Sequence, residues 1–454
     1  MTMIGLEIHI QLPTKSKMFC SCPNAVSEDP NSTVCPVCLG LPGSKPSVNR
    51  RAVELATTAA KTLHCGLLDK TWFSRKTYFY PDLAKNFQIT QFEAPVGTEG
   101  FLDISGRRVR ISRVHMEEDP ARAVHDLSPG QEFSLLDYDR SGVPLIEIVT
   151  MPDMDSPVQA REFLRTLLDE LRYVGVVVEG EDLKIRADAN ISIEGGERVE
   201  IKNVTGLRNL ERCLDFEHRR QEKLSKARMS VKRETRSFDE EKGVTVASRE
   251  KEEEQDYGYI FEPDLPVYDL KLLSGEMKFS MTATEKAAEL EKRLGLPAAE
   301  TKMLLLSSKP LGDMLEDIAK RVEAKHALRW LNSVVKAEHY KHPEVDLKKV
   351  AGEIERVIAA FAVEKISDSV VKSAIKLIFE VGTAGELTEL EVAGDVLSEI
   401  IVEILKKDPH IAEEIRKQPK AINHLVGRVM KETKGRYDAR KIAEVIREKI
   451  EKSP

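Results

Sequence analysis

The chain lacks any apolar run long enough to cross a membrane. No stretch of about 18 apolar residues occurs in its 454 residues. The first residues enter a strand-like pattern directly, so we expect neither a membrane span nor a signal peptide. A Walker A loop is also missing, because Gly40-Leu-Pro-Gly43-Ser-Lys45 lacks the required spacing. There is no kinase glycine-rich loop and no nucleophile elbow, which excludes the commonest nucleotide-binding and hydrolase motifs.

A large charge excess of one sign is absent as well. The chain is 41% hydrophobic and 32% charged, with a net charge of −7, a balance typical of soluble globular proteins. The acidic excess argues against loose, non-specific binding to nucleic acids, although a local basic patch stays compatible with it. The length exceeds what one hydrophobic core usually reaches, so two or three domains are predicted.

Cysteine is scarce, with six in the whole chain, but four of the six share one window. Cys20-Ser-Cys22 and Cys35-Pro-Val-Cys38 form two close pairs that are separated by 12 residues. Two such pairs suit one tetrahedral ion and leave no open coordination position, so the pattern favours a structural zinc site. The alternatives are redox pairs or four free thiols. A disulfide framework would need an oxidising compartment, of which the sequence shows no sign.

Acids and bases recur on one face of strands that alternate with period two. In Met3–Leu12, Glu7 and His9 project from the face opposite the isoleucines and leucines. Three later stretches repeat this pattern, and their polar residues are Arg113, His115, Glu117 and Glu118 in 109–119, Glu147 in 144–149, and Arg186, Asp188 and Asn190 in 183–193. We interpret the four stretches as one sheet whose polar face is a reaction site. The alternative is a solvated outer sheet face.

Two further segments belong to this predicted site. The stretch 73–82 gathers three residues that suit either a pocket wall for phosphate or a partly buried strand: Lys76, Tyr78 and Tyr80. Gly195-Gly196 then turns the chain back from the fourth strand into 199–203. Of two registers for this hairpin, the hydrophobic pattern favours the one that sets Ile191 against Ile201 and Asn190 against Lys202.

Together these stretches bring carboxylates and cations to one face. The carboxylates are those of residues 7, 117, 118, 147 and 188, and the cations are those of residues 76, 184, 186 and 202. Carboxylate oxygens are the ligands that Mg²⁺ prefers, and the cations suit a polyphosphate. The residues alone therefore predict a magnesium- and phosphate-dependent enzyme with a zinc site and a helical C-terminal region.

The composition changes after the predicted sheet. Residues 238–264 hold ten acids against three bases, which predicts a solvated arm or flexible loop. From Thr284 onward the period is helical, with breaks at 295–297, 342–343, 382–385 and 408–409. The last 44 residues carry 12 Lys and Arg against seven Asp and Glu. Five of these bases could form one basic surface, which is either an ordinary charged helix face or a contact with a phosphate backbone. They are Arg428, Lys431, Lys434, Arg436 and Arg440.

Taken together, the motifs resemble the B subunit of the glutamyl-/aspartyl-tRNA amidotransferase. The matching stretches are Ile4-Gly-Leu-Glu-Ile-His9, Arg75-Lys-Thr-Tyr-Phe-Tyr-Pro-Asp82, His115-Met-Glu-Glu-Asp119, Arg140-Ser-Gly-Val-Pro-Leu-Ile-Glu-Ile-Val149, Arg186-Ala-Asp-Ala-Asn-Ile-Ser192 and, in the tail, His424-Leu-Val-Gly-Arg-Val-Met-Lys431. The resemblance covers essentially the whole chain. It implies an α+β fold with a cradle-like catalytic domain (1–280, mixed or antiparallel sheet), an all-helical domain (281–385) and a small helical, tRNA-binding tail domain (386–454).

The resemblance also implies a reaction. Such a subunit uses Mg-ATP to phosphorylate the side-chain carboxylate of misacylated Glu-tRNA(Gln) or Asp-tRNA(Asn). Ammonia, which a partner amidase subunit releases from Gln or Asn, then displaces phosphate. The complex would be a ligase that forms carbon–nitrogen bonds with glutamine as amido donor, and a heterotrimer with the amidase and a small third subunit. We expect it to be cytoplasmic, with no membrane partner.

Position by position, the resemblance implies a role for each site residue. The magnesium ligands would be Glu7, His9, Glu117 and Glu147, and the catalytic site would also include Glu118 and Asp188. The ATP-binding pocket would be formed by Lys76, Tyr78, Tyr80, Arg186, Asn190 and Lys202.

The four cysteines occur in only some members of this family, which agrees with a structural zinc. Asp139 departs from the family pattern, because many members have Asn there. A related two-subunit archaeal enzyme carries an inserted domain for which this chain has no room, so the three-subunit form is favoured. The competing interpretation is a non-catalytic, zinc-containing scaffold that binds tRNA.

Overall fold

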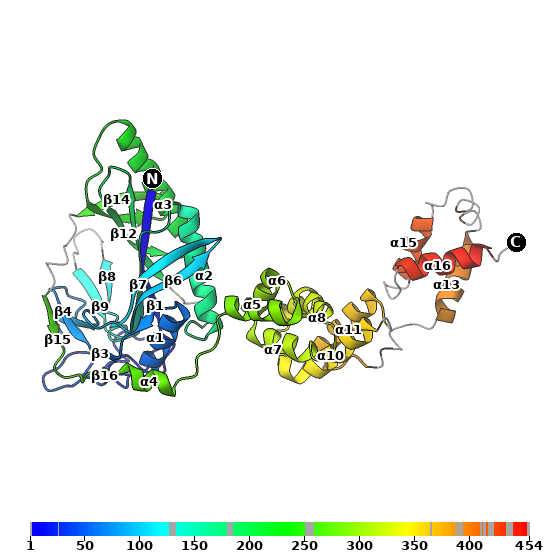
Figure 1. Ribbon diagram of the computed structural model, residues 1–454, viewed down its shortest axis with the longest axis horizontal. Helices are drawn as coiled ribbons and strands as arrows, with labels where there is room; N and C mark the ends of the chain where they lie inside the picture. The colour runs from blue at the N-terminus through cyan, green and yellow to red at the C-terminus, as the bar shows by residue number, and fades with distance from the viewer. Residues whose placement is uncertain are drawn as a thin grey trace. The chain divides into compact units, whose positions relative to one another are not determined.

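The computed structural model describes residues 2–25, 27–126, 133–178, 185–249, 258–363, 366–385, 387, 394–408, 411, 415, 422–432 and 439–451. The chain divides into two compact units, residues 1–282 and 283–454. The strands and the helices that end at or before Glu276 belong to the first unit (Figure 1), whereas the described part of the second unit contains helices alone. This arrangement confirms the predicted α+β class. None of the described helices is long and apolar enough to span a bilayer.

The first strand lies at the centre of the main sheet. In β1 (Thr2–Gln11) every second side chain is apolar, and Ile4, Leu6, Ile8 and Ile10 are at most 1% exposed. This strand pairs antiparallel with β10 (Pro144–Thr150) on one side and with β11 (Arg186–Ile193) on the other. Next to these lie β7 (Arg107–Glu118) and β12 (Val199–Thr205). All four strands with acids on one face are therefore neighbours, as the alternating pattern predicted.

The remaining strands extend this sheet or form small ribbons. The order of the main path is β14-β13-β12-β11-β1-β10-β7-β5-β4-β15, with β2 and β6 attached through β7. Among the strands that the structure describes, β12 and β13 alone pair in parallel, so the sheet is mixed. The strands not yet given are β2 (Gly66–Leu67), β3 (Lys70–Thr71), β4 (Ser74–Thr77), β5 (Phe87–Thr90), β6 (Gly97–Ile104), β8 (Arg122–Asp126), β9 (Phe133–Asp137), β13 (Glu234–Asp239), β14 (Val244–Arg249), β15 (Gly258–Phe261) and β16 (Tyr268–Asp269).

Three long helices cover the apolar face of the sheet. They are α1 (Arg50–Thr62), α2 (Pro157–Tyr173) and α3 (Leu207–Lys226), and their apolar side chains share one core with those of β1. Asn49 caps α1 by accepting hydrogen bonds from two backbone N–H groups, and Ser156 caps α2 ahead of Pro157; Asn and Ser are favoured at the N-cap and Pro at the first helical position. A short helix, α4 (Leu270–Glu276), follows. Because the helices occupy the apolar face, the face with the acids lies opposite them.

The β11–β12 hairpin has a different register from the predicted one. Ile191 faces Val199 and Asn190 faces Glu200. The turn is tighter than expected, since Gly196 N–H donates to Ile193 C=O at 3.0 Å and Gly195 takes φ +78°, which glycine adopts without strain. The shift is two residues, so every side chain keeps its face of the sheet. Its consequence is that Glu200, not Lys202, lies opposite Asn190.

The solvated arm expected at 238–264 is wrong for the part that the structure describes. β14 pairs with β13 at one end of the sheet, and β15 pairs with β4 at the other. Asp239 closes the turn between β13 and β14 by accepting from Lys242 N–H (2.9 Å) and Gly243 N–H (2.8 Å). The alternation of Val244 and Val246 with polar residues then supports a strand. Residues 250–257 lie outside the described residues.

The described residues of the second unit form two helical clusters. The first is built around Trp330 and contains α5 (Ala283–Leu294), α6 (Ala298–Ser307), α7 (Lys309–Ile318), α8 (Ala324–Trp330), a π-helical turn η2 (Leu331–Val335), α9 (Lys336–Lys341), α10 (Leu347–Ala362) and α11 (Asp368–Val381). The second contains α13 (Gly394–Lys407), α15 (Ile422–Glu432) and α16 (Ala439–Glu451). Four of these helices, α5, α9, α11 and α13, end next to the predicted breaks, and Gly382 after α11 takes φ +90°. Lys434 and Arg436 lie outside the described residues.

Candidate active site

Strand register brings the predicted acids together across the sheet. His9 of β1 faces Glu147 of β10, and Glu147 faces His115 of β7. On its other side, β1 sets Glu7 opposite Asp188 of β11. Side chains that face each other on antiparallel strands lie about 5 Å apart at their Cβ atoms. Four neighbouring strands thus place polar side chains in a row on the face that the helices leave uncovered.

One part of this row, the His9 group, consists of His9, Glu117 and Glu147. Their potential ligand atoms all lie within 4.8 Å of one another. His9 Nε2 lies 3.4 Å from Glu117 Oε1 and 3.2 Å from Glu147 Oε2. His115 Nε2 lies 3.6 Å from Glu147 Oε2, and His115 is only 4% exposed. The two carboxylates of the group are almost buried, so their charges interact strongly.

Burial and charge shift the ionisation of this group. Burial lowers the pKa of His9, but the hydrogen bond to Glu147 and the charge of Glu117 outweigh it and raise the pKa to about 10. Burial raises the pKa of Glu117 to about 7 and lowers the pKa of His115 to about 4. Burial would raise the pKa of Glu147, yet its neighbours hold that pKa well below the usual range. The charge of His115, and the hydrogen bond and charge of His9, are the largest of the effects that lower this pKa.

A second part of the row, the Glu7 group, consists of Glu7, Asp188 and Glu200. Their potential ligand atoms also lie within 4.8 Å of one another. Asn190 Nδ2 donates to Glu7 Oε1 at 3.3 Å, and Asn203 N–H donates to Asp188 Oδ1 at 2.7 Å. Burial is the main cause of a raised pKa at both Glu7 and Asp188, and the other acids raise the pKa of Glu7 further. Three acids therefore converge, and the charges of His9 and Lys202 only partly offset the effects that raise the pKa of Glu7 and Asp188.

Both groups fit a divalent cation. The Glu7 group offers three carboxylate oxygens, and the buried Asn190 Oδ1 beside it has no hydrogen-bond partner among the described residues. An all-oxygen set with excess negative charge suits Mg²⁺. The His9 group mixes an imidazole with two carboxylates, a donor set that also suits softer ions such as Zn²⁺ or Fe²⁺. The single predicted magnesium site thus becomes two neighbouring groups, with Glu7 in the second.

Three of the predicted cations lie along the same face. Burial has the largest effect on the pKa of His115 and of Glu117, and the charge of Lys76 on β4 lowers both pKa values. The charge of Lys202 likewise lowers the pKa of Asp188, against the larger effect of burial. Arg186 faces His9 in the register, and burial lowers its pKa. These cations are placed to neutralise an anion bound over the two groups.

The structure brings other predicted residues to different places. Glu118 joins neither group, because its carboxylate accepts from Lys85 Nζ at 2.6 Å and from Ile89 N–H at 2.9 Å. β4 ends at Thr77, so Tyr78 and Tyr80 follow the strand instead of continuing it. Tyr78 is half-buried and Tyr80 is 46% exposed. Their contact with ATP stays a prediction.

Sequence reasoning missed Glu200 as a site residue. Its side chain is 4% exposed and completes the Glu7 group. The sequence does contain a signal for Glu200. It lies two residues before Lys202 in the same predicted strand, so the two side chains must project from the same face. The incorrect hairpin register hid it by moving Glu200 away from Asn190.

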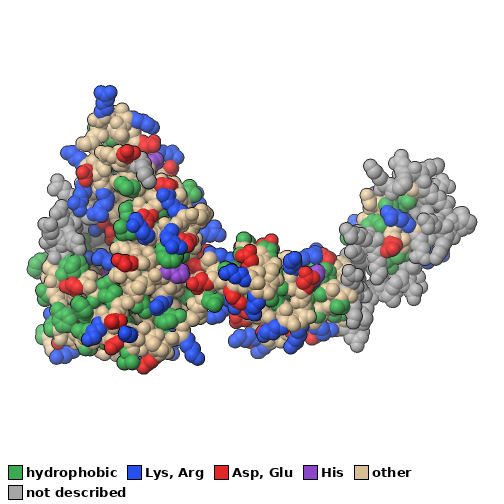
Figure 2. Space-filling view, viewed as in Figure 1, with side chains coloured by type: hydrophobic (Ala, Val, Ile, Leu, Met, Phe, Trp, Pro, Cys, Tyr) green, Lys and Arg blue, Asp and Glu red, His purple; other side chains and the backbone are tan. Residues whose placement is uncertain are grey.

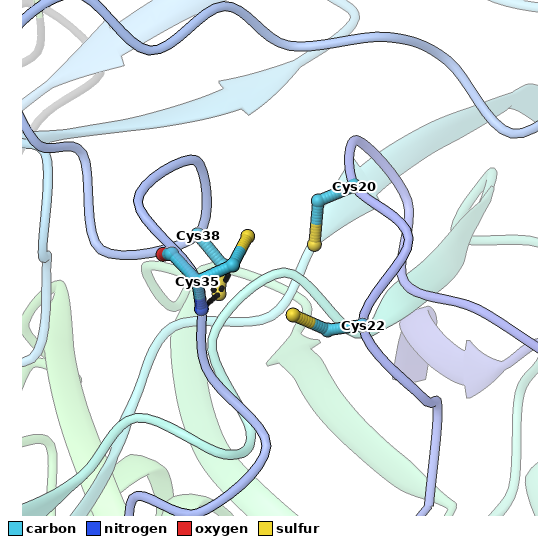
Figure 3. Close-up of side chains that lie close together, drawn as sticks. All are labelled: Cys20, Cys22, Cys35 and Cys38. Atoms are coloured by element: carbon cyan, nitrogen blue, oxygen red, sulfur yellow. Dashed lines mark hydrogen bonds between the residues drawn. The ribbon is translucent and has the colours of Figure 1, made fainter.

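The four cysteines form a separate group. Figure 3 shows Cys20 and Cys22 on one loop segment, with their sulfur atoms directed toward those of Cys35 and Cys38 on another. All four Sγ atoms lie within 4.8 Å of one another, and those of Cys35 and Cys38 are 3.9 Å apart. Zn–S bonds of about 2.3 Å in a tetrahedron require sulfur atoms about 3.8 Å apart. The four sulfur atoms are therefore close enough together to bind one zinc ion.

Lys17 lies next to the cysteine group. Its side chain is fully buried, and its Nζ lies 3.8 Å from Cys38 Sγ. A hydrogen bond with Cys20 is the main cause that lowers the pKa of Cys38 to about 5, and the charge of Lys17 contributes. Four thiolates around Zn²⁺ carry a net charge of about −2, so a buried ammonium next to them offsets part of that charge.

Asp139 joins the cysteine loop to the sheet. Its Oδ1 accepts from Thr33 N–H at 2.6 Å and its Oδ2 from Ser32 N–H at 3.2 Å, just ahead of Cys35. Ser141 Oγ donates to Cys38 C=O at 3.1 Å from the same turn before β10. The residue that departs from the family pattern thus holds the cysteine loop and lies outside both acid groups.

Comparison with known proteins places this site in a family. Residues 2–273 match the family described as GatB/GatE catalytic domain, and residues 313–450 match the one described as GatB domain. The first match alone covers more than half of the chain. The chain belongs to the GatB family.

Curated relatives of this GatB-family chain align with it over nearly its full length. Three of them are from Methanospirillum hungatei (37% identical, covering 99% of this chain and 98% of the relative), Sulfolobus acidocaldarius (38%, 99% and 100%) and Thermotoga maritima (37%, 99% and 98%). Each is named as the B subunit of an aspartyl/glutamyl-tRNA(Asn/Gln) amidotransferase. Both acid groups and the cysteine group lie within the catalytic-domain match.

Proposed function

We propose that this chain is the activating subunit of a tRNA-dependent amidotransferase. It would transfer the γ-phosphoryl group of ATP to the side-chain carboxylate of Glu-tRNA(Gln) or Asp-tRNA(Asn), with release of ADP. Ammonia from a partner amidase subunit would then attack the acyl phosphate, phosphate would leave, and an amide would remain. A free carboxylate cannot react in this way because its leaving group would be oxide.

The convergence of two acid groups, each with one member on β1 and the others on neighbouring strands, carries this proposal. Phosphoryl transfer depends on positioning and on neutralising the charge of the phosphate oxygens. Mg²⁺ held by the Glu7 and His9 groups would supply much of that neutralisation. Lys76, Arg186 and Lys202 would bind the phosphate oxygens, and the buried floor of β-strands would keep water from the acyl phosphate. The non-catalytic scaffold has less support, since a scaffold has no need for six converging ligands.

The remaining parts of the proposal concern stability and assembly. The cysteine group would hold a structural zinc ion, since four thiolates leave no position for a substrate. The relatives are named as one subunit of an amidotransferase, which supports assembly with an amidase and a small third subunit into a heterotrimeric ligase with glutamine as amido donor. Reduced thiols and a tRNA substrate both suit the cytoplasm.

The direct test is the variant Glu147→Gln, which removes a charge and keeps the shape of the side chain. Glu147 contacts both His9 and His115, so its charge organises the His9 group. We expect hydrolysis of ATP that depends on misacylated tRNA to fall at least about a hundredfold, because loss of a charged group that acts in the transition state costs about 3 kcal/mol or more. The measurement is ADP release by the assembled complex.

A matched control separates this effect from general damage. Glu54→Gln on α1 removes a carboxylate whose ion pairs with Arg50 and Arg51 are exposed, and such pairs contribute little to stability. This control should keep full activity, and both variants should unfold at the wild-type temperature. Normal ATP hydrolysis by Glu147→Gln would remove the basis of the catalytic proposal and leave the scaffold.

A further inference from the structure

The end of α3 and the turn after it form a strongly basic segment, which we call the α3 tip (residues 219–233). It contains a single acid, Glu222, against seven bases, Arg219, Arg220, Lys223, Lys226, Arg228, Lys232 and Arg233. The whole chain has a net charge of −7, so this concentration of positive charge is local. The proposed metal, ATP and zinc sites use none of these residues.

Most of these side chains project into solvent. Arg220 is half-buried between Glu217 and Glu234, to which it makes ion pairs of 2.7 Å, and the other six are exposed. Arg219 and Lys226 are 75% and 79% exposed, and their pairs with Asp215 and Glu222 add little stability at that exposure. Figure 2 shows Lys and Arg side chains at the top of the first unit, where Figure 1 places the end of α3. Arg220 therefore belongs to the fold, and the remaining bases form a charged surface.

The α3 tip adjoins the ends of the strands that carry the acids. Glu197 N–H in the β11–β12 turn donates to Val231 C=O at 3.2 Å, which fixes the tip against that turn. The turn adds exposed Arg198 and two exposed acids, Glu194 and Glu197, so the excess of bases persists. Asp188 lies five residues before the end of β11, or roughly 17 Å along the strand at about 3.3 Å per residue. The single-stranded 3′ end of a tRNA can span that distance.

We propose that the α3 tip binds the phosphate backbone of an RNA stem, so that the attached 3′ end reaches the acid groups. Like charges held at this density repel one another, and an RNA duplex relieves that repulsion through its regularly spaced phosphates. Apart from Arg220, the bases are long, exposed side chains. The buried polar side chain of the segment, Gln221, donates to Ile191 C=O and to Glu217 within the fold and so does not face a base edge. The contact is therefore with the backbone and independent of sequence. This inference rests on the proposed function, since it takes the substrate to be a tRNA.

The test is a triple variant of the full-length chain, Lys223→Gln, Arg228→Asn and Lys232→Gln. Arg228 has φ +57°, which asparagine tolerates better than most residues. Binding of fluorescent Glu-tRNA(Gln) is measured by anisotropy over a series of salt concentrations. Each phosphate contact contributes about 0.9 to the slope of log affinity against log salt. Removal of three such cations should make the slope shallower by about 2 to 3 and weaken binding at low salt by at least about tenfold.

Two controls make the outcome specific. Lys70→Gln, Lys271→Gln and Lys278→Gln together remove three exposed lysines from the strand and helix segments around α4, and this variant should bind as the wild type does. Lys223→Arg with Lys232→Arg keeps the charge and should also retain affinity and slope. A thermal unfolding scan of each variant confirms an intact fold.

Each contrary result has a distinct meaning. If the wild-type chain binds Glu-tRNA(Gln) no better than a simple polyanion and shows no tRNA-dependent ATP hydrolysis, the proposed function fails, and this inference falls with it. If the wild type binds and reacts but the triple variant keeps its affinity and salt slope, only the assignment of the α3 tip is wrong. A triple variant that keeps tRNA binding but no longer co-purifies with the amidase would show that the α3 tip contacts a protein, which also overturns the inference.

Discussion

At the scale of single residues, Asp139 tests how much one carboxylate adds to the cysteine loop. It accepts from two backbone N–H groups through two different oxygens, whereas an asparagine has one carbonyl oxygen to offer. We expect Asp139→Asn to lower the free energy of unfolding by about 1 kcal/mol, and Asp139→Ala by about 2 kcal/mol. Urea unfolding gives both values.

The same variants should release zinc faster to a chelator, because the loop ahead of Cys35 would be less restrained. Asp137→Asn is a suitable comparison, since Asp137 Oδ1 accepts from the neighbouring Asn31 N–H at 3.1 Å on an exposed part of the loop. A rate of zinc release that is unchanged in Asp139→Ala would mean that the cysteines position themselves without help from the turn.

Glu200 is the residue whose role depends most on the observed register. Its carboxylate completes the Glu7 group, so Glu200→Gln should weaken binding of a divalent cation there by at least about tenfold, a loss of about 1.4 kcal/mol. Mn²⁺ titration followed by electron paramagnetic resonance measures this without any reaction. Glu194→Gln, in the exposed turn of the same hairpin, is the control. Equal Mn²⁺ affinity in wild type and Glu200→Gln would show that the Glu7 group is not a cation site.

At the scale of elements, the cysteine loops should depend on their metal for stability. Binding energy of a structural zinc ion is folding energy, because the unfolded chain has no preformed site. Cys35→Ser, or removal of zinc by a chelator under reducing conditions, should lower metal content and the unfolding temperature. Hydrolysis of ATP should survive below that temperature, since no cysteine belongs to either acid group. Purified wild-type protein without zinc by elemental analysis would contradict this prediction.

A second element, the turn after α11, is held by one carboxylate of α10. Glu353 Oε2 accepts from Ala384 N–H at 3.1 Å, Thr383 Oγ1 at 3.0 Å and Arg356 at 2.8 Å. The hydrogen bond with Arg356 is the largest cause that lowers the pKa of Glu353 to about 2 from a usual 4.5. A lowered pKa means that the stabilisation is complete above about pH 4.5 and disappears as the pH falls toward 2.

Hydrogen exchange at Ala384 measures this dependence locally. At pH 7 the protection of that amide should fall in Glu353→Gln by a factor that corresponds to about 1 kcal/mol, a value reduced for the partial exposure of the carboxylate. The difference between variant and wild type should shrink at pH 3. Glu355→Gln serves as the control, because Glu355 pairs with Arg321 instead. An equal difference at both pH values would show that ionisation of Glu353 is not what holds the turn.

The elements also show where sequence reasoning succeeds. Period-two alternation located β1, β7, β10 and β11 and placed Glu7, His9, Glu147 and Asp188 on one face, because burial of one sheet face dictates the pattern. Asn49 and Ser156 begin two helices through hydrogen bonds to neighbouring residues, the kind of feature that depends on local sequence alone. The register of β11 and β12 was not predictable in the same way, since it depends on the left-handed conformation of Gly195 and on a bulge near Asp188 with Asn203 at φ +57°. Strand order across β1 is likewise a long-range property.

At the scale of the whole molecule, charge is distributed unevenly along an acidic chain. The α3 tip lies in the first unit, and the bases of the C-terminal region lie in the second. There, Arg428 pairs with Asp408 at 3.3 Å in an exposed position, and Lys431 lies in the last turn of α15. Two separate basic regions suit a long, folded polyanion better than a short nucleotide, which needs one site.

The last prediction follows from these two regions. A truncation should end after Gly385, because α13 shares a hydrophobic core with α15 and α16 and would expose it if left behind. We expect the truncated chain to bind tRNA more weakly and with a shallower salt dependence, by about 0.9 in slope for each phosphate that is no longer neutralised. Glutaminase activity of the partner, measured without tRNA, should persist if residues 1–282 hold the amidase.

The full-length double variant Arg428→Gln, Lys431→Gln should show part of the same effect without any loss of core. Because regions that share no partners contribute additively, truncation combined with the α3 tip triple variant should lower the slope by the sum of the two separate effects. Equal affinity and slope in full-length and truncated chains would mean that the C-terminal charges form only a solvated surface.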